Sequence, residues 1–478
     1  MHNTHVIDPV TRLEGHAKIT LHVDDAGGVT DARFHVTEFR GFEEFCRGRP
    51  LAEMPGLTAR TCGICPVSHL LASAKAADAI HAVAVPEAAA LQRRLANLGQ
   101  IIQSHALSVF HLSAPDLLLG MDSDPAQRNV FGLMAAEPEV VRRGIRLRQF
   151  GQEVIAAVAG QKIHGTGIVD GGVAEPFTTE KREAIATRLD EALAAAQGTL
   201  ELIASIHDRF SRELASFGAF PTLLLGQCTP DGRWEHIDGQ LRIIDADGAI
   251  VVAGMDPADY ASVLGEAANV DSYLKSPYYK PLVEDGDLSP AMYRVGPLAR
   301  VNIAESFGVP HADAALADFR ERFGRTPRSS FLFHYARLLE ILASVELIAG
   351  VLDDERLMGE HVRAEAGINR RRGVGASEAP RGTLFHDYSV DEHGVITDVN
   401  MLIATGQNNL AMNRAILDIA REFVDGPEIS EGTLNRLEAG LRAFDPCLSC
   451  STHALGQMPM VVEMVDGAGE LVTTARRE

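Results

Sequence analysis

Two Cys-x-x-Cys pairs near opposite ends of the chain constrain the fold more than any other feature. Cys62 and Cys65 form the first pair, and Cys447 and Cys450 form the second. Two residues between cysteines let both sulfur atoms face one centre from a tight turn, so four thiolates could bind one soft metal site. Corresponding cysteines are 385 positions apart, whereas a zinc ribbon closes within roughly 15–20 residues. A shared site therefore requires a whole fold that brings the two ends together.

The spacing alone leaves several kinds of site open. The pairs could hold a structural zinc ion, form a disulfide, or be two unrelated thiol pairs. The other two cysteines, Cys46 and Cys228, are isolated in the sequence. We expect these two to be buried core thiols rather than ligands.

The residues that flank the pairs shift the balance between these interpretations. Residues 60–69 read RTCGICPVSH, and residues 445–453 read DPCLSCSTH. Both stretches resemble the cysteine signatures of the large subunit of nickel–iron hydrogenases. The resemblance extends from residues 6–16 (VIDPVTRLEGH) to residues 451–464 (STHALGQMPMVVEM). Within that family, the chain resembles the cytoplasmic, NAD-linked bidirectional class.

The resemblance implies both the ligands of the site and its chemistry. It assigns Cys62, Cys65, Cys447 and Cys450 to nickel, and it gives Cys65 and Cys450 also to an iron ion that carries carbon monoxide and cyanide. The implied reaction is the reversible heterolytic oxidation of dihydrogen. The proton is then expected to pass to Cys447 or Cys450 and onward to Glu14, since a carboxylate with an adjustable pKa suits proton transfer.

A magnesium site is also implied by the family's pattern. Glu43 matches the magnesium-binding glutamate, and a hard oxygen ligand suits that ion. Leu402 matches a residue that offers its backbone carbonyl, so its side chain is not informative. His453 matches the third ligand, at the end of the second cysteine signature.

Four further residues are assigned to the surroundings of the metals by the resemblance. Arg381 is expected to lie over the iron, where a permanent cation suits an anionic cyanide ligand. Thr405 and Gly406 occupy positions that offer hydrogen bonds to cyanide, and Gly406 can do so only through its backbone. Asp116 matches an aspartate close to the active site.

The resemblance divides the chain at His453. Residues 1–453 are expected to form a single domain, because the two cysteine pairs must meet. Residues 454–478 are expected to be a pro-segment that a dedicated protease removes after nickel-insertion factors have loaded the site. An ordinary C-terminal strand is the alternative, because residues 460–465 have strand propensity.

Cysteine usage points to partner subunits. An iron–sulfur cluster needs about four cysteines, and only the isolated Cys46 and Cys228 remain once the two pairs are used, which is too few to hold one. A small cluster-bearing subunit is therefore required for the electrons, and the class implies diaphorase subunits with FMN that pass them to NAD. Two rivals remain open, namely a respiratory-complex scaffold subunit without metal and a structural-zinc protein.

Composition excludes some classes of protein. The formal net charge of −21 argues against a nucleic-acid partner. No stretch approaches the roughly 20 apolar residues of a membrane span. Six cysteines without a secretory segment favour a reducing compartment, so we expect a cytoplasmic protein.

Hydrophobic periodicity predicts a mostly helical α+β fold, with a long central helix bundle and peripheral β-hairpins. Hairpins are expected over residues 19–36 and 241–252, and residues 271–297 are expected to be an irregular surface connection. Residues 180–214 are expected to form one long helix, with a break at Gly198 as the open alternative. Further helices are expected over residues 329–351, 408–424 and 431–443.

Overall fold

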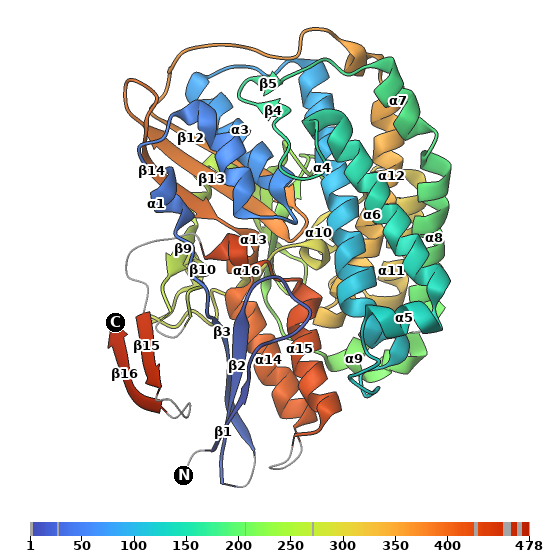
Figure 1. Cartoon of the computed structure of the whole chain (residues 1–478), viewed down its shortest axis with the longest axis vertical. Helices are drawn as coiled ribbons and strands as arrows, with labels where there is room; N and C mark the ends of the chain where they lie inside the picture. The colour runs from blue at the N-terminus through green and yellow to red at the C-terminus, as the bar shows by residue number, and fades with distance from the viewer. Residues whose placement is uncertain are drawn as a thin grey trace.

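Four long helices form a bundle along one side of the molecule (Figure 1). They are α4 (Glu87–Ala106), α6 (Pro138–Ala159), α8 (Leu189–Ser205) and α12 (Phe333–Asp353). Helix α4 packs between α6 and α12, and α8 packs on α12. The computed structural model describes residues 3–25, 28–205, 207–269, 272–424, 429–452, 460–465 and 471–477.

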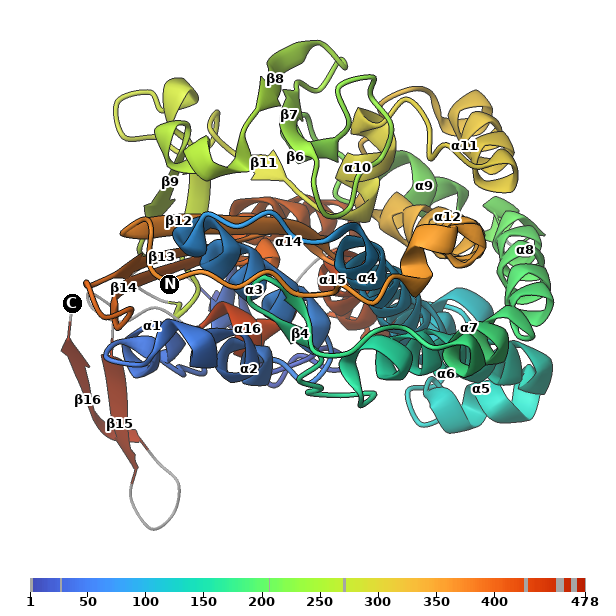
Figure 2. The ribbon, with the colours of Figure 1, turned by 90° about the horizontal axis from the view of Figure 1, so that it is seen from above.

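A three-stranded antiparallel sheet lies inside the molecule, which hydrophobic periodicity did not predict. It contains β12 (Arg372–Ala379), β13 (Gly382–Val390) and β14 (Ile396–Leu402). Figure 2 shows it between helix α3 (Pro66–His81) and the layer that contains β6 (Leu223–Cys228), β7 (Gln240–Ile244) and β8 (Ile250–Met255).

Two glycines of β12 allow α3 to lie directly on the sheet. A Cβ atom at Gly373 would lie 2.3 Å from the carbonyl oxygen of Ala76, and one at Gly375 would lie 2.0 Å from that of Ala72. Both distances are far below van der Waals contact, so only glycine permits this approach. The contact brings the start of α3, which follows Cys65, toward the turn between β12 and β13.

The two ends of the chain pack against each other. The predicted N-terminal hairpin is confirmed as β2 (Ala17–Val23) and β3 (Val29–Val36), joined by β1 (Asn3–Ile7). Strand β3 packs on α14 (Asn409–Phe423), which in turn packs on α15 (Glu431–Phe444). The helices predicted at these two positions are confirmed, and α15 leads directly into the second cysteine pair.

The second predicted hairpin is also confirmed, whereas the connection after it differs from expectation. Strands β7 (Gln240–Ile244) and β8 (Ile250–Met255) pair antiparallel, in a sheet with β6 (Leu223–Cys228) and β11 (Tyr293–Arg294). The prediction of an irregular surface connection over residues 271–297 was therefore wrong in part. Residues 291–300 are buried. This part of the tyrosine-rich segment packs into the core and does not form a loop that faces solvent.

The single long helix predicted over residues 180–214 is wrong, and Gly198 does not break it. The segment contains α7 (Thr179–Ala186), α8 and α9 (Ser211–Ser216). Gly198 lies within α8, where a Cβ atom would lie 3.2 Å from the guanidinium of Arg143 on α6. The glycine therefore serves helix packing, which periodicity cannot reveal.

The C-terminal segment contains a hairpin of β15 (Met460–Val465) and β16 (Leu471–Arg477). It projects from the body of the molecule (Figure 2). His453, together with residues 454–459, 466–470 and 478 of the predicted pro-segment, lies outside the described residues. Among the helices that the structure describes, none is long and apolar enough to cross a membrane.

We predict that Gly151→Ala destabilises the protein by about 1–3 kcal/mol, because overpacking forces well-packed elements apart. At the α4–α6 crossing, a Cβ atom on Gly151 would lie 2.5 Å from the Gly99 carbonyl oxygen. Gly350→Ala on α12 is the matched control, since a Cβ atom there has no neighbour within 4 Å. Thermal unfolding should show a loss for the first variant and none for the second. Equal melting temperatures would contradict this account of the crossing.

Candidate metal centre

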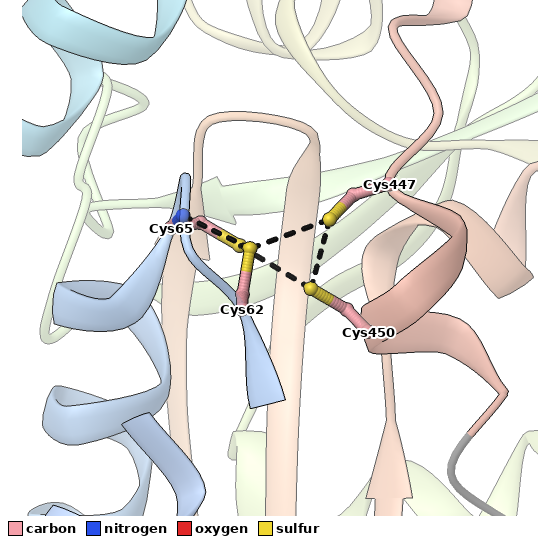
Figure 3. A group of neighbouring side chains, drawn as sticks. All are labelled: Cys62, Cys65, Cys447 and Cys450. Carbon is pink, nitrogen blue, oxygen red and sulfur yellow. Dashed lines mark hydrogen bonds between the residues drawn. The ribbon is translucent and has the colours of Figure 1, made fainter. Parts of the chain in front are cut away.

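The four predicted cysteine ligands meet at one buried point (Figure 3). Their sulfur atoms all lie within 4.8 Å of one another. The sulfur of Cys62 is 2.9 Å from that of Cys65 and 3.3 Å from that of Cys447, and Cys450 is 2.9 Å from Cys447 and 3.7 Å from Cys65. The two ends of the chain thus form a single four-sulfur cluster.

Backbone amides and a helix start hold the first pair. The amides of Ile64 and Cys65 donate to the sulfur of Cys62, at 3.2 and 3.1 Å. Cys65 is the N-cap of α3, and Pro66 occupies the first helical turn, where a missing N–H costs nothing. Both the amides and the positive end of the helix dipole favour thiolates.

The second pair is held by a short helix and a threonine. Cys447 precedes α16 (Leu448–Ser451), and its amide donates to the hydroxyl oxygen of Thr405 at 2.9 Å. Thr405 also lines the pocket beside the cysteines, and its predicted hydrogen bond to cyanide stays a prediction. Gly406 is buried within α13 (Ala404–Gln407) and is not among the residues that line this pocket.

The buried sulfurs cannot all ionise without a cation. Hydrogen bonds from Cys447, Cys450 and Cys62 hold the pKa of Cys65 well below its usual range. Burial, reinforced by the neighbouring sulfurs, raises the pKa of Cys450 well above its usual range. The bare cluster therefore favours a thiolate at Cys65 and a thiol at Cys450, and a bound cation would favour the thiolate form of both.

Glu14 lies against the second cysteine pair. Its carboxylate oxygen Oε2 accepts from the amide of Ser449 at 3.0 Å, and its backbone carbonyl accepts from the amide of Leu448 at 3.1 Å. Both amides belong to residues between Cys447 and Cys450. The half-buried carboxylate thus sits between the cysteines and the surface.

Arg381 is buried beside the cysteines and is paired with Asp445. Its Nη2 atom lies 3.0 Å from Oδ2 of Asp445, its Nε donates to the Asp445 carbonyl, and its Nη1 donates to the hydroxyl of Ser104 at 3.3 Å. Burial lowers the pKa of Arg381, but the charges of Asp445 and the cysteines outweigh it, so the net pKa is raised. The guanidinium therefore remains a cation.

Sequence reasoning missed two residues of this site. Asp445 begins the second cysteine signature, and its ion pair with Arg381 was not foreseen. His69 ends the first signature, lines the same pocket and hydrogen-bonds both Cys65 and His386. Their positions inside the two signatures were the only available signal.

Glu43 and Leu402 lie close together, as a shared cation would require. Glu43 is buried on α1 (Phe42–Cys46) and accepts from the amide of Met401, next to Leu402, at 2.8 Å. The carbonyl of Thr452 accepts from the amides of Arg40 and Gly41, at 3.0 and 3.1 Å. Thr452 therefore lies beside the start of α1, and His453 lies outside the described residues.

Asp116 lies in a separate cluster of charges. It pairs with Arg12 through Nη2 at 2.6 Å and with Arg442 through Nε at 3.2 Å, and it accepts from Asn435 at 3.0 Å. It is not among the residues that line the pocket beside the cysteines. Because Arg12 precedes Glu14 by two residues, Asp116 fixes the loop that carries Glu14. The predicted catalytic role of Asp116 stays a prediction.

Comparisons with known proteins agree with this site. The family described as nickel-dependent hydrogenase matches residues 40–127, and one described as HoxL-like matches residues 4–39. The NAD-reducing hydrogenase HoxS subunit beta of Cupriavidus necator is 42% identical, over 99% of both chains. The chain belongs to the nickel-dependent hydrogenase family.

Other relatives and solved structures show the same family. An F420-non-reducing hydrogenase subunit of Methanothermobacter thermautotrophicus is 40% identical over 98% of both chains. The crystal structure of an NAD+-reducing [NiFe]-hydrogenase in the H2-reduced state has a TM-score of 0.91 and 44% identity, covering 94% of this chain and 99% of that one. The chain is accordingly a [NiFe] hydrogenase catalytic subunit with the family's large-subunit fold.

The residues present fit a nickel–iron centre. Four cysteine sulfurs suit a soft metal. The pocket beside them is lined by Cys65, Cys447 and Cys450 and by the buried guanidinium of Arg381. A structural zinc ion with four ligands is a closed site that needs no such pocket. Cys46 and Cys228 are buried outside the cluster, as predicted.

We predict that Glu43→Gln stabilises the metal-free protein at pH 8 but not at pH 5. Burial raises the pKa of Glu43 from 4.5 to about 7, an effect that Lys275 partly opposes. Folding therefore disfavours the ionised form, and stability falls as pH rises through this window, by an amount of the order of 3 kcal/mol. Urea unfolding at the two pH values checks this, with exposed Glu44→Gln as the control. A gain for Glu43→Gln at pH 5 equal to that at pH 8 would contradict the assignment.

Proposed function

We propose that this subunit oxidises and produces dihydrogen in a complex that exchanges electrons with NAD. When bound, a nickel–iron centre supplies the heterolytic cleavage of dihydrogen. The observation that carries the proposal is the four-sulfur cluster, with Glu14 on one side and Arg381 beside it. Cys62, Cys65, Cys447 and Cys450 would hold nickel, and Cys65 and Cys450 would also hold iron.

Glu14 is proposed to move the proton. Cys447 or Cys450 would accept it first, because Glu14 lies against the two residues between them. Glu14 accepts a hydrogen bond from the amide of Ser449, between these two cysteines, so its carboxylate is placed beside them to receive the proton. Its half-buried position provides an exit toward solvent.

Arg381 and Thr405 are proposed to bind the diatomic ligands of iron. Both line the pocket beside Cys65 and Cys450. A buried guanidinium offers fixed donors and a permanent charge to a cyanide ion, and the Thr405 hydroxyl can still donate, since it accepts from Cys447. Gly406 would contribute through its backbone.

Glu43, the carbonyl of Leu402 and His453 are proposed to bind Mg²⁺. The buried carboxylate of Glu43 has a raised pKa in the absence of a cation, and an adjacent divalent ion would remove that cost. The position of Thr452 beside α1 supports the third ligand.

The electrons are proposed to leave through a small iron–sulfur subunit, then through FMN-containing diaphorase subunits. Among the residues that the structure describes, the four clustered cysteines are the only group able to hold a metal in this way. The chain's relatives include NAD-reducing hydrogenases. A cytoplasmic location, expected from cysteine usage, belongs to the same proposal.

Residues 454–478 are proposed to be removed after nickel insertion, by a dedicated protease. The alignment with the solved NAD+-reducing enzyme includes 99% of that chain but only 94% of this one. The alignment with the HoxS subunit beta sequence, in contrast, includes 99% of this chain. A mature chain shortened at its C-terminus would produce this difference. Nickel-insertion factors would act before the cut.

Infrared spectroscopy of the purified protein tests the proposed centre. We expect absorption bands of metal-bound carbon monoxide and cyanide that change under hydrogen, together with a mass that lacks residues 454–478. A blank spectrum with the tail still attached would identify an immature precursor. A blank spectrum with the tail removed, and stoichiometric zinc instead of nickel, would overturn the proposal in favour of structural zinc.

We predict that Glu14→Gln lowers hydrogen-dependent dye reduction by about 10²- to 10⁴-fold, the usual contribution of a positioned proton carrier. The amide side chain keeps the hydrogen bond to Ser449, so nickel content and infrared bands should stay as in the wild type. Glu38→Gln, at a partly exposed carboxylate of the same N-terminal region, is the control. Full turnover in Glu14→Gln would refute the relay.

A further inference from the structure

Arg381 stands at the tip of a tight, buried hairpin turn. Strands β12 and β13 pair as far as Ala379 and Gly382, which leaves Pro380 and Arg381 as the two turn residues. All four residues are buried. Backbone carbonyls at such a tip have no partner strand, and a buried carbonyl without a partner costs free energy.

Arg300 donates hydrogen bonds to the backbone carbonyls of this turn. It lies in α10 (Pro297–Ile303) with a fully buried side chain. Its Nη1 donates to the carbonyl of Ala379 at 2.8 Å, and its Nη2 donates to that of Pro380 at 3.3 Å. These are the carbonyls of the two residues that precede Arg381.

Two buried carboxylates orient the Arg300 guanidinium. Glu340 on α12 accepts from Nε and Nη2, both at 2.6 Å, and Glu378 on β12 accepts from Nη1 at 2.8 Å. With the two carbonyls, these contacts use all five N–H donors of the arginine. Buried charges in this arrangement are paired and hydrogen-bonded, as their burial requires.

A second connection runs from the same cluster to Arg381. Glu340 lies 2.8 Å from Nε2 of His105 on α4. Burial lowers the pKa of His105 to about 4, so the neutral ring donates to Glu340. Ser104, the preceding residue, accepts from Nη1 of Arg381. The cluster thus adjoins both the backbone and the guanidinium of Arg381.

We propose that Arg300, oriented by Glu340 and Glu378, is a positioning residue that sets the place of the Arg381 guanidinium beside the four cysteines. This role rests on the function proposed above. It is carried by the geometry of the turn, because a shift of the Ala379–Pro380 backbone moves the residue that follows. A lysine cannot replace Arg300, since an ammonium has three donors and no planar fork.

The test compares Arg300→Lys with Arg93→Lys in the matured complex. Arg93 is a matched control: it is buried, pairs with Asp78 at 2.6 Å, and donates to the carbonyls of Gly172 and Val169. Those carbonyls belong to a turn that does not line the pocket beside the cysteines. Both variants lose a comparable set of bonds, so a purely structural effect would be similar in the two.

We expect Arg300→Lys to shift the cyanide infrared bands and to lower kcat/KM for hydrogen by about 10- to 100-fold, the usual effect of residues behind a metal site. Arg93→Lys should leave both readouts as in the wild type. Wild-type bands and kinetics in Arg300→Lys, with a stability loss equal to that of Arg93→Lys, would overturn the positioning role.

A second measurement, which does not require bound metals, tests the proposal even if a variant fails to mature. Amide hydrogen exchange of the peptide spanning residues 379–385, measured on the unmatured chain, should be about 10-fold faster in Arg300→Lys than in the wild type. Unchanged exchange would overturn the proposal. Glu340→Gln should produce the same changes at smaller size. Absence of carbon monoxide and cyanide bands in a wild-type chain that has lost residues 454–478 would overturn the proposed function itself, whatever the exchange data show.

Discussion

The contact between the sulfur atoms of Cys62 and Cys447, at 3.3 Å, depends on nearly the whole chain. Neither cysteine pair can form a four-sulfur cluster alone, so the fold must hold the two pairs at a fixed position relative to each other. Two packing contacts do this. Helix α3 lies on the glycines of β12, and the N-terminal sheet lies on α14.

Burial of the site creates an electrostatic requirement that the surrounding residues meet. Thiolates, a guanidinium and a carboxylate lie together with almost no exposure to solvent, so each charge needs a partner nearby. Asp445 serves Arg381, and Glu340 serves Arg300. The same low-dielectric surroundings strengthen every fixed donor that points into the pocket. Pairing that permits burial therefore also prepares the pocket for anionic ligands.

The sequence predicted those features that depend on local pattern or on a motif. The four cysteines, α12, α14, α15 and two hairpins were all found in this way. It failed where tertiary packing decides the outcome: Gly198 packs against Arg143 rather than breaking a helix, and the buried segment around Tyr293 looked like a loop. Asp445 was overlooked although it precedes Cys447 by only two positions, because a carboxylate gives no sign of its partner in the sequence.

The cysteines and Arg381 belong to different kinds of secondary structure. Cys65 and Cys447 lie at the starts of α3 and α16, where amides and helix dipoles favour negative sulfur. Arg381 instead lies at the tip of a β-hairpin, beside the cysteines. A helix start is rigid by its own hydrogen bonds, but a hairpin tip is not. The tip must therefore be held by groups outside the hairpin, and Arg300 is the described residue that binds both of its carbonyls. Precision at the pocket thus depends on a buried ion-pair cluster that never touches the metals.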